Sequence, residues 1–200
     1  MKARKNNMLK PNGYDEAQVL GEFTPIQLGG HKLVIKQVEE LTGSNGNQYI
    51  KVSFDTTKDD VQPNYYTNAY KQDSRDVKKW SGVTTVFPTD YEGKTSRQFK
   101  TFCTSVEKSN PGFKMVWGAK FCISLKDKLV GGVFGEEEYY NSFNELKTAR
   151  KLFWFRSIDG VMDAEIPNKR TVEQEQPVVL DGSAILDGFS PIDSDDDLPF

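Results

Sequence analysis

The chain is short of the residues that build metal and redox sites. It has one histidine, His31, and two cysteines, Cys103 and Cys122, among 200 residues. Zinc sites take their ligands from Cys and His at short spacings, and no such spacing occurs here. The two cysteines are typical of reduced, buried thiols, and His31 is interpreted as a surface residue or one satisfied by hydrogen bonds. We therefore expect no metal and no cofactor.

Long apolar runs are missing too. No stretch approaches the roughly 18 consecutive apolar residues that a membrane span needs. The basic start, MKARKNNMLK, lacks the apolar segment and the small-residue cleavage site of a secretory signal. The sequence therefore predicts a cytoplasmic protein with no membrane partner.

Patterns for enzyme chemistry are also absent. Glu136, Glu137 and Glu138 are consecutive, so in a strand or loop their side chains point apart and do not form a metal cluster. The glycine pairs at 29–30 and 131–132 lack the Walker spacing of a phosphate-binding loop. Cys103 has no histidine-based pattern that would activate it as a nucleophile. We expect a binding protein with no catalytic residue.

Charge is divided unevenly along the chain. Residues 1–170 hold all 26 Lys and Arg against 21 Asp and Glu, a balance of +5. Residues 171–200 hold 8 acids and no Lys or Arg, a balance of −8, and the two sum to the net charge of −3. A mildly basic body with an acidic tail is typical of proteins that contact nucleic acid or carry an interaction segment.

Alternating apolar and polar residues predict β-strands in the body. The stretches His31–Leu41 and Gln48–Thr56 flank an Asn-Gly step, which is a strong hairpin signal. The second stretch has an apolar face of Ile50, Val52 and Phe54 and a second face of Tyr49, Lys51, Ser53 and Asp55. Further strands are predicted at 84–87, 121–125, 128–135 and 147–158, with a bulge or bend at Gly131 and Gly132.

One main helix is predicted, over Thr95–Gly112. Its apolar residues Phe99, Phe102, Cys103 and Val106 follow the spacing of a buried helix face, with Thr95 or Ser96 as the cap. The stretch 64–80 is ambiguous between a strand and a short helix, and Trp117 is expected in the core. Five or six strands with a helix between the third and fourth predict a mainly β, OB-fold-like barrel. A β-sandwich or an α+β domain is the alternative.

These patterns divide the chain into three parts. Residues 1–16 are interpreted as a flexible N-terminal arm, and 17–168 as the OB-fold-like domain. Residues 169–200 are interpreted as a disordered acidic tail, because acidic residues alternate there with scattered apolar ones without a lasting period.

The last six residues carry the most specific motif. Asp195, Asp196, Asp197, Leu198, Pro199 and Phe200 resemble the acidic tip of bacterial single-stranded DNA-binding proteins, which typically reads Asp-Asp-Asp-Ile-Pro-Phe. Leu198 stands where that tip has isoleucine. The stretches KTFCTSVEKSNPGFK (100–114), KLVGGVFGEEEYY (128–140) and KLFWFRSIDGV (151–161) are similar to a family of such proteins encoded by phages and mobile elements of Gram-positive bacteria. The resemblance implies coating of single-stranded DNA, without sequence specificity, during replication, recombination and repair in the host cytoplasm.

The tip also fits a docking role on physical grounds. Phe200 offers a ring and an α-carboxylate together, which an apolar pocket with an Arg or Lys can capture. Pro199 stiffens the approach, so less entropy is lost on docking. The aspartates attract a basic surface over a distance. We expect recognition by replication, recombination or repair proteins; the alternative is a solubilising tail.

Three stretches combine the basic and aromatic residues that single-stranded DNA requires. Bases stack on aromatic rings, and phosphates lie along a basic groove. The predicted DNA-binding residues are Tyr49 and Lys51; Tyr65, Tyr66, Tyr70, Lys71, Arg75, Lys78, Lys79 and Trp80; and Lys151, Phe153, Trp154 and Arg156.

Each stretch has a structural alternative. Tyr49 has the alternative of a cross-strand surface pair, and the stretch 65–80 that of a loop packed on the barrel. One face of the last strand must enter the core, and we expect Trp154 and Arg156 to point outward, opposite Phe153.

A rival hypothesis also fits the sequence. The body balance of only +5 is low for a nucleic-acid binder. An adaptor or decoy that does not bind DNA, but displays the tip to occupy host proteins, is therefore the alternative function. Whether the chain forms a homo-oligomer stays open.

Overall fold

The structure is a computed structural model that describes residues 10–12, 14, 24–44 and 46–172. The predicted arm at 1–16 lies almost wholly outside these residues. Most of the predicted tail and the whole Asp195–Phe200 tip also lie outside them.

Five strands and three short helices make up about half of the described chain. The strands are β1 (Gly29–Thr42), β2 (Gln48–Thr56), β3 (Val83–Val86), β4 (Leu129–Tyr140) and β5 (Leu146–Arg156). The α-helices are α1 (Tyr65–Gln72), α2 (Arg97–Ser109) and α3 (Phe121–Leu125), with short 3-10 helices η1 (Gly118–Lys120) and η2 (Val161–Asp163). The prediction of a mainly β protein with one longer helix is confirmed.

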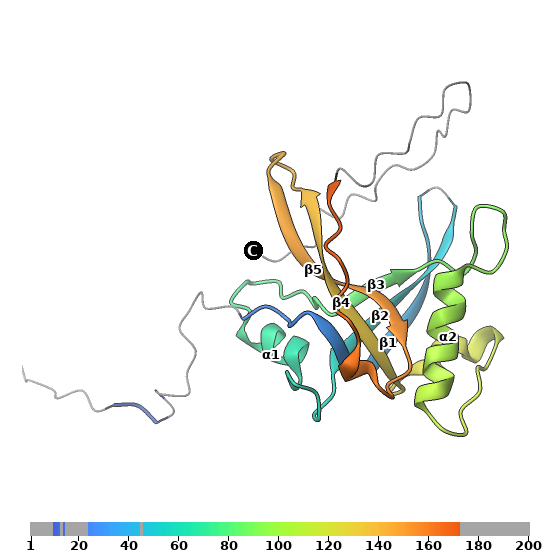
Figure 1. Ribbon diagram of the computed structural model, residues 1–200, viewed down its shortest axis with the longest axis horizontal. Helices are drawn as coiled ribbons and strands as arrows, with labels where there is room; N and C mark the ends of the chain where they lie inside the picture. The colour runs from blue at the N-terminus through green and yellow to red at the C-terminus, as the bar shows by residue number, and fades with distance from the viewer. Residues whose placement is uncertain (1–9, 13, 15–23, 45, 173–200) are drawn as a thin grey trace, which may run out of the picture.

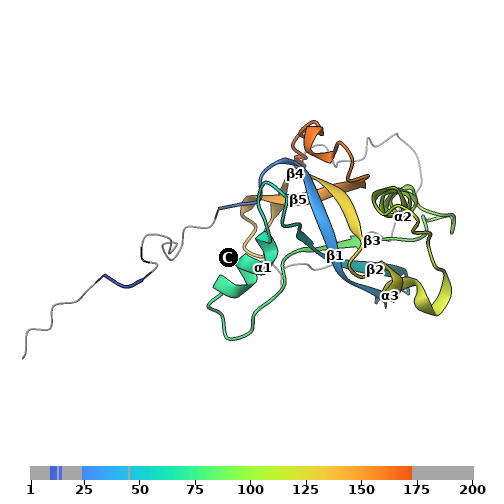
Figure 2. The same cartoon turned by 90° about the horizontal axis from the view of Figure 1, so that it is seen from below.

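The strands form one antiparallel sheet in the order β3-β2-β1-β4-β5. β1 is central and pairs with β2 on one side and with the first half of β4 on the other. α1 and α2 lie at opposite sides of this sheet in both views (Figures 1 and 2). β3 and β5 are the two edges, and the pairing between them that would close a barrel is absent from the described strands.

The hydrophobic core covers one face of the sheet. Ile35 lies opposite Phe54, and Val38 opposite Val52, and all four are buried. From α2 the fully buried Phe102 packs on the sheet, with its ring centroid 4.8 Å from that of Phe155. Each such side chain contributes about 1.5–3 kcal/mol when it is fully buried, so this packing is the main force that holds α2 against the strands.

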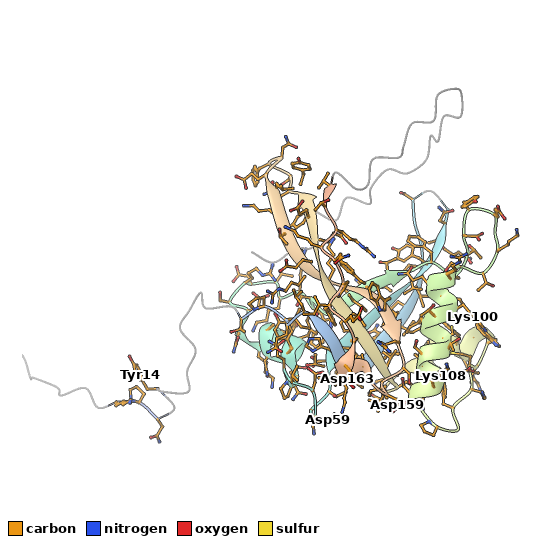
Figure 3. All side chains as sticks on the ribbon, in the orientation of Figure 1. Tyr14, Asp59, Lys100, Lys108, Asp159 and Asp163 are labelled. Carbon is orange, nitrogen blue, oxygen red and sulfur yellow. The ribbon has the colours of Figure 1, made fainter. Side chains whose placement is uncertain are left out.

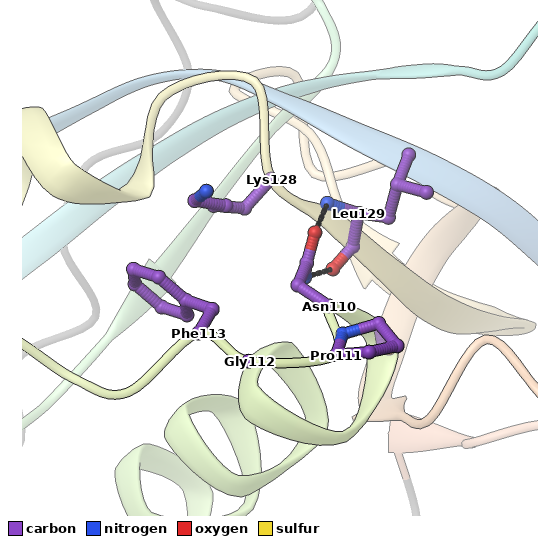
Figure 4. Close-up of a pocket in the computed structure, with 7 residues that line it drawn as sticks. Asn110, Pro111, Gly112, Phe113, Lys128 and Leu129 are labelled. Carbon is purple, nitrogen blue, oxygen red and sulfur yellow. Dashed lines mark hydrogen bonds between the residues drawn. The ribbon is translucent and has the colours of Figure 1, made fainter.

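Both ends of α2 are fixed by side chains. At its start the Ser96 hydroxyl accepts a hydrogen bond from the Phe99 N–H at 3.1 Å, as the sequence predicts. At its end the Asn110 amide donates to the Leu129 carbonyl at 2.8 Å and accepts from the Leu129 N–H at 3.0 Å (Figure 4). Asn110 thus pairs with β4 as a strand residue would, and this pairing fixes the start of β4 beside the end of α2.

The predicted strand at 121–125 is wrong. This segment is α3, in which Phe121 and Leu125 are buried and Ile123 is 74% exposed. In a strand the three side chains would point to the same face, whereas helical geometry separates the middle one. The ambiguous stretch at 64–80 is α1 followed by a loop. β4 continues to Tyr140, five residues beyond the end of the strand predicted at 128–135.

Gly131 and Gly132 permit close packing of β4. A Cβ atom at Gly132 would lie 2.5 Å from a methyl carbon of Leu33, and one at Gly131 would lie 2.7 Å from the carbonyl oxygen of Ser157. The irregularity predicted at this pair occurs one residue later, where the pairing with β5 shifts between Val133 and Phe134.

Candidate nucleic-acid interface

The outward face of β2 and β3, here called the β2–β3 face, carries the first two predicted residues. It consists of Tyr49, Lys51 and Ser53 with Val83 and Thr85. Lys51 lies between Thr85 on β3 and Glu39 on β1, and it takes part in no ion pair within the described residues. The Tyr49 ring lies 6.0 Å from the ring of Phe87. This face therefore offers a ring and an unneutralised cation side by side.

The Tyr70–Trp80 pair lies near the other end of β2. The two ring centroids are 5.9 Å apart, and the Lys78 ammonium lies 5.9 Å from the centroid of Tyr70. The Trp80 indole N–H donates to the carbonyls of Phe54 and Gly82, at 3.2 and 3.1 Å, which fixes the ring beside β2. Tyr49 and Phe54 are five strand residues apart, about 17 Å, so rings flank the β2–β3 face at both ends.

A buried aspartate positions α1 and therefore Tyr70. Asp55 is fully buried, and its carboxylate accepts hydrogen bonds from the N–H groups of Tyr66 and Thr67 at 2.9 and 3.3 Å. These are orphan donors of the first helical turn, so Asp55 caps α1 from the neighbouring strand. The sequence places Asp55 on the outward face of β2, and α1 covers it there.

The structure buries one of the predicted rings, Tyr66, and partly buries its neighbour, Tyr65. Tyr66 is 7% exposed and stands edge-on to Phe54 at 5.4 Å, and its burial raises its pKa well above the ordinary value. Tyr65 is half-buried, and its hydroxyl is hydrogen-bonded to the backbone of Ile26. Burial raises the pKa of this hydroxyl to about 12. Tyr66 has no open face for a base, because the helix start that Asp55 holds turns it into the core.

Some predicted cations are neutralised within the protein. Arg75 binds both carboxylate oxygens of Asp73 at 2.7–3.1 Å, and these hydrogen bonds lower the pKa of Asp73. Lys78 donates a hydrogen bond to the carbonyl of Lys71 at 3.2 Å. Lys71 and Lys79 are exposed. Among the candidate cations of this cluster, Arg75 is therefore the least available to a phosphate.

The second half of β4 and the first half of β5 form a two-stranded ribbon (residues 136–151) that projects from the body (Figure 1). Its charged side chains form ion pairs with one another and with the chain after η2. The ion pairs are Glu136–Arg150 (3.4 Å), Glu137–Lys151 (2.9 Å), Glu145–Lys147 (3.0 Å), Glu138–Lys169 (2.5 Å) and Glu137–Arg170 (3.5 Å). Lys151, a predicted phosphate ligand, is therefore neutralised by its neighbour.

The predicted orientation of the last strand is confirmed. Trp154 is 42% exposed and Arg156 is exposed, whereas Phe153 and Phe155 are buried. The burial of Phe153 argues against its prediction as a DNA contact. The guanidinium of Arg170 lies 4.0 Å from its ring centroid and covers the ring. Arg170 also exchanges backbone hydrogen bonds with β4, so the packed part of the chain extends beyond the predicted boundary at 168.

Arg150 connects the two aromatic stretches in the described part of the chain. Arg150 donates to the Ile26 carbonyl at 2.7 Å, beside the Tyr65 side chain. No ring contact or hydrogen bond in the described part of the chain links Trp154 or Arg156 to Tyr70 or Trp80. The contacts within the described residues therefore do not join the exposed residues of the two stretches into one site. The β2–β3 face is the stronger candidate.

The prediction that Trp117 lies in the core is wrong. Trp117 is 65% exposed, and its ring stacks on Phe121 at 5.6 Å and 7°. A signal was available in Gly118, which follows at once and has a positive φ of 76°, as expected for a turn.

Some other polar and charged side chains lie in the core or on the surface of α2. His31 is fully buried, with Nδ1 2.8 Å from an Asp60 carboxylate oxygen and Nε2 3.0 Å from the Gln27 carbonyl. Of the two predicted alternatives, the histidine satisfied by hydrogen bonds is confirmed and the surface residue is wrong. Lys100 and Lys108 are exposed on α2 (Figure 3). No group of three or more His, Cys, Asp or Glu in the described ranges could hold a metal ion.

Comparisons with known proteins give no identification. No protein-family model matches the chain, and no curated protein sequence matches it. None of the helices described above is both long enough and apolar enough to cross a membrane.

Proposed function

We propose that this protein binds single-stranded DNA along the β2–β3 face, without sequence specificity over most of the bound strand. The observation that carries the proposal is the strand order β3-β2-β1-β4-β5 with α2 between β3 and β4. An OB-fold is a five-stranded, partly open barrel that binds oligonucleotides on its second and third strands. Tyr49 and Lys51 lie on that face.

Stacking and phosphate contacts supply the binding energy in this proposal. Bases stack on Tyr49 and on the Tyr70–Trp80 pair, each worth roughly 1–3 kcal/mol. Lys51, Lys71 and Lys78 contact phosphates, so the affinity falls as salt rises.

The Asp195–Phe200 tip supplies the second half of the proposed function. It lies outside the described residues, and its support is the sequence motif alone. In the proposal, replication, recombination or repair proteins with a basic surface and an apolar pocket bind the tip while the body stays on DNA.

The rival function has one observation in its favour. Arg75, Arg150 and Lys151 are held in internal ion pairs, which lowers the positive potential available to a phosphate backbone. An adaptor or decoy that displays the tip without binding DNA would need no such potential.

Fluorescence anisotropy of a labelled oligo-dT separates the two functions. The full chain and a variant lacking residues 193–200 are compared across a salt series. We expect both forms to bind, with an affinity that falls steeply as salt rises. Absence of binding by either form at low salt would overturn the DNA-binding proposal and favour the adaptor.

A further inference from the structure

A cleft of about 490 Å³ lies at the end of the β1–β2 hairpin, next to η1 and the start of α2. This volume falls in the range of about 300–1,000 Å³ that small-molecule sites occupy. Its aromatic wall consists of Tyr49, Phe99, Trp117 and Phe121, and its polar rim includes Glu40, Thr42 and Gln48. A cleft with flat rings and a few polar groups fits a planar ligand with a hydrogen-bonding edge.

Trp117 provides a ring face that is already positioned. One side of its indole stacks on Phe121, and Phe99 lies 6.2 Å away at a tilt. The residue is still 65% exposed, so ring surface remains open to the cleft and to solvent. Phe121 is buried and anchors the stack to the core, so little entropy is lost when a second planar group adds to it.

The polar rim favours one type of base edge. A carboxylate only accepts hydrogen bonds, whereas the Gln48 amide both donates and accepts. Glu40 also lies beside the Cys122 thiol; burial, with this carboxylate as the next cause, raises the pKa of Cys122. A carboxylate has about four acceptor sites, so Glu40 retains capacity for a ligand that carries an amino group.

The cleft is continuous with the β2–β3 face. Tyr49 lines the cleft and also stands on that face next to Lys51. The ring of Phe87, the residue directly after β3, lies 6.0 Å from that of Tyr49, and Pro88, the next residue, lines the cleft as well. Tyr49 is therefore the residue that the cleft and the β2–β3 face share, and a bound strand would pass from one to the other there.

We propose that the cleft holds one unstacked nucleobase with an exocyclic amino group, stacked on Trp117 and read by Glu40 and Gln48. Cytosine, adenine and guanine carry such a group, and thymine does not. The inference rests on the proposed binding of single-stranded DNA and adds a base preference at one position of the bound strand.

A titration with mononucleotides tests the cleft without requiring the rest of the DNA path. Indole N–H resonances of the full chain are followed by NMR as dCMP or dTMP is added at millimolar concentration, with Trp117→Phe used for assignment. We expect dCMP to shift the Trp117 resonance more than dTMP does. A Trp117 resonance that neither nucleotide moves would overturn the proposal.

Oligonucleotide binding gives the second test. We expect Trp117→Ala to weaken binding of oligo-dC by roughly 5- to 150-fold, with Trp117→Phe retaining most of the affinity. Glu40→Gln should reduce the preference for oligo-dC over oligo-dT. Tyr91→Ala, which removes a ring that is 94% exposed on another loop, is the matched control.

The outcomes separate this inference from the proposed function. If the parent protein binds oligo-dT and Trp117→Ala leaves all oligonucleotide affinities unchanged, the nucleobase cleft is overturned and DNA binding stands. If the parent protein binds no oligonucleotide at low salt, the proposed function fails, and only a dCMP-specific shift would preserve a nucleobase site. If removal of residues 193–200 alone shifts the Trp117 resonance, the chain itself occupies the cleft and the inference is wrong.

Discussion

The β2–β3 face and the ribbon contain the same kinds of residue and present different surfaces. Each carries at least one aromatic ring and one lysine on paired antiparallel strands. On the ribbon, strand register sets Glu136 opposite Arg150, and Glu137 lies within 2.9 Å of Lys151. On the β2–β3 face the β3 neighbour of Lys51 is Thr85, while Glu39 on β1 accepts a hydrogen bond from Gln37 instead.

This difference shows that cross-strand register decides which basic residues can serve a polyanion. A count of lysines along the sequence treats Lys51 and Lys151 alike. Lys151 is already paired, and a phosphate would have to compete with Glu137 for it. Lys51 forms no ion pair within the described residues, and Glu39, its neighbour on β1, is hydrogen-bonded to Gln37. A ring and an unpaired cation therefore occur together on the β2–β3 face.

The largest expected effect concerns the rings. Tyr49→Ala should weaken binding of oligo-dT by roughly 5- to 150-fold, because one stacked base is lost. Tyr140→Ala, which removes a half-exposed ring from the ribbon, should leave the affinity nearly unchanged. Anisotropy measures both, with thermal melting to confirm that each variant is folded. Equal losses in the two variants would remove the distinction between the regions.

The next effect concerns the cations. Lys51→Ala should reduce the slope of log affinity against log salt by about 0.7, the value for one phosphate contact on a single strand. Lys151→Ala should leave the slope unchanged, because its charge is already compensated by Glu137. Salt titrations of both variants with the same oligonucleotide provide the comparison. A reduced slope for Lys151→Ala alone would place the DNA on the ribbon.

Much of the fold could be predicted because the period of the apolar residues is strong. Ile50, Val52 and Phe54 alternate without a break, and β2 has the predicted bounds. Ser96 supplies the predicted helix cap. At 121–125 the pattern fails, because five residues with apolar positions at both ends fit a strand and one helical turn equally well.

The candidate site was less predictable, because accessibility depends on contacts between distant segments. Tyr66 is buried because Asp55 caps α1 from β2, and Phe153 is covered by Arg170, 17 residues away in sequence. Neither contact can be predicted from the residues that flank Tyr66 or Phe153 in the sequence. Trp117 shows the reverse case, since its exposure follows from a turn at Gly118 that a reading of apolar residues alone overlooks.

A smaller effect is expected when the ribbon is made more like the β2–β3 face. Glu137→Gln removes the partner of Lys151 and Arg170, so both cations become available to phosphates. We expect affinity for oligo-dT to rise a few-fold at low salt and to return to the parent value at high salt. Glu92→Gln, which frees Lys94 on a distant loop, is the control. An equal response to the two changes would mean that the ribbon lies outside the DNA path.

The smallest effect concerns stability and an exposed ion pair on the body. A hydrogen bond from Lys32 lowers the pKa of Asp59 from 3.8 to about 2. Because the folded-state pKa is depressed, the contribution of this pair to stability is present above about pH 4 and is lost as pH falls toward 2. Asp59→Asn should therefore lower the melting temperature slightly at pH 7 and make no difference near pH 2. The control is Asp159→Asn, at an exposed aspartate without an ion pair in the described chain. A melting temperature that Asp59→Asn lowers equally at pH 7 and pH 2 would show that the carboxylate acts there by something other than its charge.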